Sequence, residues 1–144
     1  MRMLIMVVGL CVASVVSAGP LAEVAGRYTY GIYAVTLPNG RVLSLKDLGA
    51  SAAVLEISDA AGTITLRMSM LSGKEVVETA KVVEAHVVKG KGYWIAQWPD
   101  VSYPVKAVIS MSGTSLTSDT RFDHPEDAQR FGTVEHAELT RIGK

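Results

Sequence analysis

The sequence predicts an all-β fold, a single antiparallel up-and-down β-barrel of about eight strands with one short helix near residues 125–131. Apolar and polar residues alternate with the two-residue period of a strand over most of the chain after residue 18. Turn signals separate these runs at intervals of roughly 8–12 residues, a spacing typical of antiparallel barrels and sandwiches. No repeat, low-complexity tract or linker divides the chain. Closure into a barrel is favoured because it removes both edges of the sheet.

Residues 1–18 have the pattern of a secretory signal peptide. Arg2 provides the positive start, residues 3–16 form an apolar core, and Ala18 ends a small-residue cleavage pattern. The apolar run is shorter than the ~20 residues that a membrane-spanning helix needs. The sequence therefore predicts cleavage after Ala18, a secreted or periplasmic protein with no transmembrane segment, and one barrel domain over residues 19–144.

The composition of residues 19–144 excludes several kinds of chemistry. The only cysteine, Cys11, lies in the predicted signal, so the mature chain has no thiol, no disulfide framework and no cysteine metal site. Leu10 directly before it argues against a lipid anchor. Arg2 is the only charge that cleavage removes, which leaves 13 basic and 14 acidic residues in a chain of 126. Without a basic surplus or a long charge run, nucleic acid is not an expected partner.

The first predicted strand covers residues 26–37, the longest strand-like run in the first half of the mature chain. Tyrosine, valine and isoleucine in it suit a pleated, half-buried surface. Alternation assigns its residues to two faces, Tyr28, Tyr30, Ile32 and Ala34 on one and Thr29, Tyr33, Val35 and Leu37 on the other. Pro38-Asn39-Gly40 then predicts a tight turn, because Asn-Gly tolerates positive φ at low cost.

Later strands are predicted from the same alternation. Their ranges are 41–46, 52–58, 63–71, 93–98, 104–111, 114–118 and 133–142. Residues 74–89 are ambiguous, because their Glu, Lys and Ala content and several helically spaced valines favour a helix. The density of valine and the Lys89-Gly90-Lys91-Gly92 turn favour one or two strands instead. We prefer strands, since a lone helix would interrupt a continuous meander.

The polar segment 119–132 is predicted to contain the short helix, which begins at Pro125 and ends before Gly132. Its acidic stretch 119–127 lacks the oxygen spacing and the glycine of a calcium loop, so no metal site is expected. We interpret its acids as solvated residues that cap the helix.

Gly26-Arg27-Tyr28 opens the first predicted strand, and Arg141 lies near the end of the last one. These two ends resemble the lipocalin and fatty-acid-binding group of small barrels, the calycins. That group opens its first strand with Gly-x-Trp and carries a basic residue at the end of its last strand, packed over the aromatic ring. Tyrosine here stands in place of the tryptophan. The resemblance implies a similar strand order and a cation–π contact between Arg141 and Tyr28.

Aromatic and methionine side chains are the candidate binding residues. The interior of an eight-stranded barrel either fills with side chains or encloses one small ligand. The first alternative makes these residues a core, and the second makes them the lining for a small apolar or amphipathic ligand. The small Ala96 between Trp94 and Trp98 leaves space for the second. The predicted ligand-binding residues are Tyr28, Tyr30, Met68, Trp94 and Trp98.

Two other functions stay open at this point. A barrel enzyme, an isomerase or cyclase, could use His136 and Glu138, which lie two residues apart and so share a face. An interaction or inhibitor module could act on a protein partner through surface loops at residues 98–103 or 119–131. No nucleophile elbow, phosphate loop or dinucleotide fingerprint is present, so neither a catalytic residue nor a cofactor is expected.

Overall fold

The computed structural model describes residues 19–143. The predicted signal peptide, its cleavage after Ala18 and Cys11 lie outside these residues. In chain order the elements are β1 (Gly26–Thr36), β2 (Val42–Leu43), the 3-10 helix η1 (Lys46–Leu48), β3 (Ala50–Ser58), β4 (Thr63–Met70), β5 (Glu75–Val88), β6 (Lys91–Gln97), β7 (Val105–Ser112), β8 (Ser115–Arg121), α2 (Pro125–Phe131) and β9 (Val134–Gly143).

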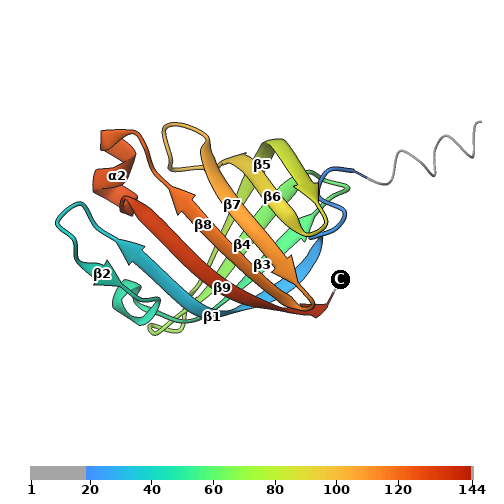
Figure 1. Cartoon of the computed structure of the whole chain (residues 1–144). Helices are drawn as coiled ribbons and strands as arrows, with labels where there is room; N and C mark the ends of the chain where they lie inside the picture. Colours follow the sequence, from blue (N-terminus) through green and yellow to red (C-terminus); the bar gives the residue numbers. More distant parts are fainter. Residues whose placement is uncertain (1–18, 144) are drawn as a thin grey trace, which may run out of the picture.

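The strands form one antiparallel sheet that closes on itself. Each long strand pairs with the next along the chain, and β1 pairs with β9 as well as with β3. The result is an eight-stranded up-and-down barrel, with the two-residue β2 paired beside the end of β1 (Figure 1). The predicted fold class is confirmed, and so is the short helix at residues 125–131. No helix in the described chain has the length and apolar character needed to cross a membrane.

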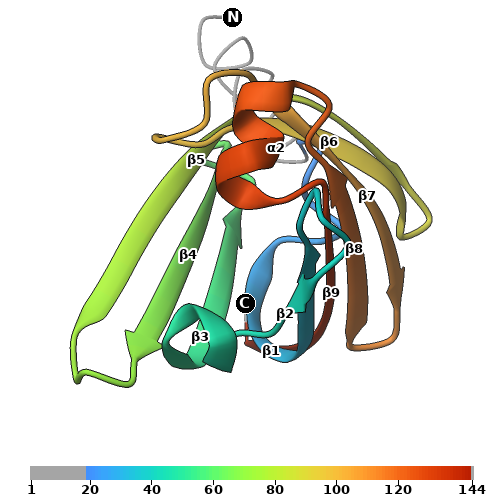
Figure 2. The same ribbon diagram turned by 90° about the vertical axis from the view of Figure 1, so that its left-hand side faces the viewer.

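The two ends of the barrel differ. At one end the strands are joined by short turns at residues 59–62, 89–90 and 113–114. Leu21 and Val24 of the lead-in are fully buried there in the main hydrophobic core, and we call this the closed end. The longer connections, including η1 and α2, all lie at the other end, the mouth (Figure 2).

A group around Arg141 fixes the closed end. The Arg141 guanidinium donates to the carbonyl oxygens of Glu23 and Ala25, each at 3.1 Å, and to the Tyr28 hydroxyl at 3.0 Å. The Tyr28 hydroxyl in turn donates to the Val24 carbonyl at 2.6 Å. The guanidinium carbon lies 5.5 Å from the centre of the Tyr28 ring, so the predicted cation–π contact is present. Burial of Tyr28 raises the pKa of its hydroxyl, and Arg141 opposes that rise.

Glycine at position 26 makes this arrangement possible. The residue has φ of +147°, a conformation that side chains rarely adopt. A Cβ atom there would lie 2.7 Å from the Gly143 carbonyl oxygen and 3.2 Å from Nε of Arg141. The Gly-x-Tyr opening is therefore a packing requirement of the closed end.

A bulge at Gly31 corrects the predicted faces of the first strand. The pairing of β1 with β9 shifts between Tyr30 and Ile32, so one extra residue is inserted in β1. Tyr28 and Tyr30 share a face as predicted, and this face is directed inward. After the bulge Tyr33 also faces inward, whereas Ile32 is half exposed on the outer surface. A prediction from strict two-residue alternation fails beyond Gly31, because the extra residue reverses the faces of the residues that follow it.

Two other segments differ from the expected strands. The predicted strand at residues 41–46 is only the two-residue β2, because reciprocal hydrogen bonds between Ser44 and Asp47 start the η1 turn. Residues 74–89 contain a single long strand, β5, in agreement with the preferred alternative. The part of β5 from Glu75 to Lys81 pairs with β4, and the part from Lys81 to Val88 pairs with β6.

We predict that Arg141→Met lowers the free energy of unfolding by about 3 kcal/mol, because three hydrogen bonds from a charged donor are lost and two of them are partly buried. Urea unfolding measures the change. Arg27→Met is the matched control on β1, since its side chain is 53% exposed and reaches Glu56 only at 4.0 Å. An equal effect of both substitutions would contradict the structural role of Arg141.

Candidate functional site

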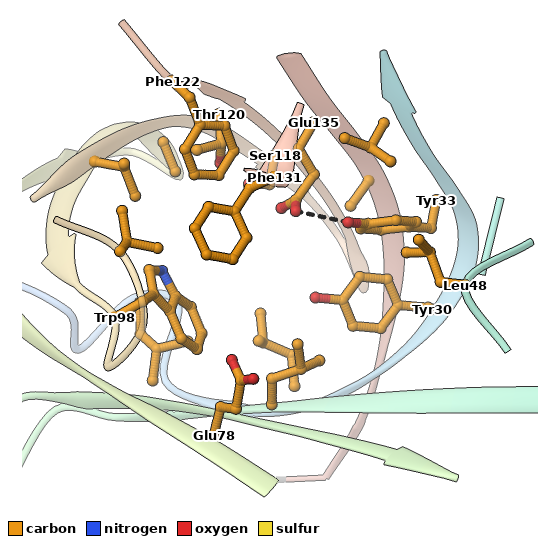
Figure 3. Close-up of a pocket in the computed structure, with 18 of the residues that line it drawn as sticks. Tyr30, Tyr33, Leu48, Glu78, Trp98, Ser118, Thr120, Phe122, Phe131 and Glu135 are labelled. Carbon is orange, nitrogen blue, oxygen red and sulfur yellow. Dashed lines mark hydrogen bonds between the residues drawn. The ribbon is translucent and has the colours of Figure 1, made fainter. Parts of the chain in front are cut away.

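A cavity of about 280 Å³ lies inside the barrel on the mouth side of the core (Figure 3). Most of its wall is apolar. The aromatic lining residues are Tyr30, Tyr33, Trp94, Trp98, Phe122 and Phe131. The aliphatic and methionine lining residues are Val35, Leu37, Leu43, Leu45, Leu48, Leu55, Ile64, Leu66, Met68, Val101, Val105, Ala107, Ala137 and Leu139. The polar ones are Glu78, Asp100, Ser118, Thr120, Arg130 and Glu135.

Four of the five residues predicted to bind a ligand line this cavity. Tyr30, Met68, Trp94 and Trp98 come from β1, β4, β6 and the loop after β6. Tyr28 does not belong to the lining, because it is fully buried at the closed end with its hydroxyl bonded to Val24. Ala96, between the two tryptophans, is fully buried in the core.

The polar groups of the cavity were missed as site residues. Strict alternation predicts Tyr33 on the face opposite Tyr30, and the Gly31 bulge brings it to the same face. Glu135 did have a signal, since alternation in the last strand places it on the same side as Ala137 and Leu139. Glu78 likewise lies two residues before Ala80 on β5, so it shares a face with that fully buried residue. An acid that shares the apolar face of a strand is the pattern that would have identified both.

Tyr33 and Glu135 form a hydrogen-bonded pair on one wall. The Tyr33 hydroxyl donates to Oε2 of Glu135 at 2.8 Å, and the Tyr30 ring lies edge-on to Tyr33 with ring centres 6.0 Å apart. Burial raises the pKa of the Glu135 carboxyl, although the Tyr33 hydrogen bond lowers it in part. Burial also raises the pKa of both tyrosines, and the neighbouring Glu135 carboxylate adds to this rise. Both hydroxyls are therefore neutral donors at physiological pH.

Glu78 faces the cavity from the opposite wall. It lies on β5, which is four strands away from β9 in either direction around the barrel. Figure 3 shows its carboxylate directed into the cavity, on the far side from Glu135. Among residues 19–143 this carboxylate has no hydrogen-bonding or ion-pair partner. It is thus free to interact with a bound molecule.

His136 and Glu138 share a side as predicted, but that side is the outer surface. His136 Nε2 lies 3.0 Å from Glu138 Oε2, and its Nδ1 lies 2.6 Å from Asp119 Oδ1. These carboxylates, Glu138 foremost, raise the pKa of the imidazole. Glu135 and Ala137, which alternate with His136 and Glu138 along β9, line the cavity instead. The hypothesis of an enzyme that uses His136 and Glu138 in an interior site is therefore wrong.

The acidic stretch around α2 supports a loop at the mouth. Asp127 is buried and accepts hydrogen bonds from the backbone N–H groups of Ser102 at 2.9 Å and Tyr103 at 3.3 Å. The interpretation of its acids as solvated is therefore wrong for Asp127. The Tyr103 ring stacks on His124 at 3.7 Å, which also joins the loop to the start of α2. No group of three or more potential metal ligands occurs within residues 19–143.

Comparison with protein-family models, with curated proteins and with solved structures found no match. The eight-stranded up-and-down barrel is consistent with a calycin-like fold. Its closing pair, Arg141 over Tyr28, agrees with the resemblance drawn from the sequence. Membership of the lipocalin group itself stays a prediction.

We predict that Glu135→Gln stabilises the protein increasingly as pH rises above the ordinary glutamate pKa of 4.5. The folded state holds the Glu135 proton more tightly than the unfolded state, so wild-type stability falls as pH rises through this range. Glutamine cannot lose a proton and still accepts from Tyr33. Urea unfolding of wild type and variant at pH 4 to 8 measures the difference in their free energies of unfolding. The contributions of other titrating groups, such as His136, are the same in both proteins and cancel in this difference.

Glu126→Gln is the control for this measurement, because Glu126 is exposed in the first turn of α2. Its difference from wild type should not become more stabilising with pH. A Glu135→Gln difference that stays constant between pH 4 and 8 would show that the carboxyl titrates as it does in water.

Proposed function

We propose that this chain, exported as its N-terminal sequence predicts, is a binding protein that holds one small, largely apolar molecule inside its barrel. The observation that carries the proposal is the cavity of about 280 Å³ on the mouth side of the core. An engineered apolar cavity of ~150 Å³ already binds benzene. The space here suits a molecule larger than one aromatic ring.

The composition of the wall supports an amphipathic ligand. Aromatic rings and aliphatic side chains supply broad apolar contact, and a few polar groups can orient the bound molecule. Tyr30, Ser118 and Thr120 provide hydroxyls, while Glu78 and Glu135 provide carboxyls. The predicted ligand residues Tyr30, Met68, Trp94 and Trp98 enter the proposal on this basis, and Tyr28 contributes by holding the closed end.

The alternative of a surface interaction module has less support. That function would be supported by a filled interior and by exposed aromatic residues in the loops at 98–103 and 119–131. Trp98 instead lines the cavity, and Phe122 packs against Phe131 with ring centres 6.0 Å apart. Tyr103 is the exposed aromatic of these loops, and it is stacked on His124.

We predict that N-phenyl-1-naphthylamine, an uncharged fluorescent probe, binds the protein and quenches its tryptophan emission. Both tryptophans of the chain, Trp94 and Trp98, line the cavity, so all of the indole signal comes from the proposed site. Leu66→Trp should weaken binding by roughly tenfold or more, because a larger side chain occupies the space that the probe needs. Probe fluorescence at increasing concentration measures the dissociation constant.

The control is Val77→Trp, which places the same new side chain on the outer face of the adjacent strand β5, where Val77 is 45% exposed. It should leave the dissociation constant unchanged within about twofold. Equal binding by the wild type and Leu66→Trp would show that the probe binds elsewhere, and the proposal would then lose its main support.

A further inference from the structure

We infer that the ligand is an organic cation, a protonated amine on an aromatic or bulky apolar body, with its ammonium group at Glu78. This inference rests on the proposed function and adds the chemical class of the ligand. It starts from the distribution of charge in the wall. Three carboxylic acids, Glu78, Asp100 and Glu135, line the cavity, and Arg130 is the single basic residue that residues 19–143 contribute to its lining.

Arg130 does not balance the interior acids. It belongs to α2 at the mouth, where it is exposed and donates to the Asp100 carbonyl oxygen at 3.1 Å. Its guanidinium also lies 4.9 Å from the centre of the Phe131 ring. The side chains away from the mouth that can be charged near neutral pH, Glu78 and Glu135, are therefore both acids. An anionic ligand would be repelled there, with no interior cation to offset the repulsion.

Glu78 is the available partner for a cation. Glu135 already accepts from Tyr33, and its raised pKa favours its neutral form. The Glu78 carboxylate, in contrast, has no partner among residues 19–143. An ammonium group bound next to this carboxylate would donate a charge-assisted hydrogen bond to it, and such bonds are roughly twice as strong as neutral ones.

The aromatic lining fits the same class of ligand. Figure 3 shows the Tyr30 hydroxyl and the Trp98 ring directed into the space that Glu78 faces. A hydroxyl oxygen accepts a hydrogen bond from an ammonium group, and the face of an indole attracts a cation. The remaining apolar wall, with Leu66 paired directly opposite Glu78 on β4, takes the body of the ligand.

Three probes of nearly equal size test the inference: 1-naphthylmethylamine, 1-naphthalenemethanol and 1-naphthoic acid, which are cationic, neutral and anionic at pH 7. Calorimetric titration measures the affinity of each. We predict that the amine binds at least about tenfold more tightly than the alcohol, which corresponds to one charge-assisted hydrogen bond. The acid should bind more weakly than the alcohol.

Glu78→Gln and Glu75→Gln form a matched pair, because both remove one negative charge from β5, one facing the cavity and one outside with its side chain 60% exposed. Glu78→Gln should abolish the preference for the amine and change the affinity for the alcohol less than about threefold. Glu75→Gln should preserve the preference. Equal effects of the two variants would overturn the role of Glu78.

The three probes also distinguish the two proposals. Equal affinities for amine, alcohol and acid would overturn the cation inference and leave the binding function in place. Failure of all three to bind would overturn both. Because the preference of the wild-type protein is itself a result, the test stands even if Glu78→Gln does not fold.

Discussion

The pairing of β1 with β9 is the contact on which the rest of the structure depends. It joins the two ends of the sheet and leaves a closed barrel whose interior is separated from the outer surface. It also builds one wall of the cavity. Val35 lies directly opposite Glu135 in this pairing, so Tyr33, two residues earlier, reaches the carboxylate diagonally across the two strands. Arg141 and Tyr28 hold the same pair of strands together at the closed end.

The cavity is obtained at a cost in stability. A void forgoes the dispersion contacts that a filled core would make, and the buried Glu135 carboxyl loses solvation. The well-packed closed end compensates for part of this, with Leu21, Val24, Tyr28 and Ile64 almost fully buried in one cluster. The barrel thus divides its interior into a part that stabilises the fold and a part that is left free for binding.

Most of the fold could be predicted because strand alternation and turn chemistry are local properties. Pro125 and Gly132 located α2, and the Gly26-x-Tyr28 opening with Arg141 located the closing contact. The predictions were wrong where a bulge interrupts the two-residue alternation, or where alternation alone does not tell which face is the inner one. Gly31 shifts the alternation by one residue, so strict alternation predicts the wrong face for Tyr33. Their spacing of two residues predicts that His136 and Glu138 share a side, but only the position of the core decides which side that is.

The way β5 is paired has a mechanical consequence. From Glu75 to Lys81 this strand is hydrogen-bonded to β4, while its ladder with β6 begins only at Lys81. The part of β5 that carries Glu78 is therefore hydrogen-bonded to a neighbouring strand on one side only, the side of β4. No ladder hydrogen bond joins residues 75–80 to β6, so backbone hydrogen bonds to β4 alone hold this part of the cavity wall. Glu78 therefore faces the cavity from a wall that has a backbone ladder on one side only.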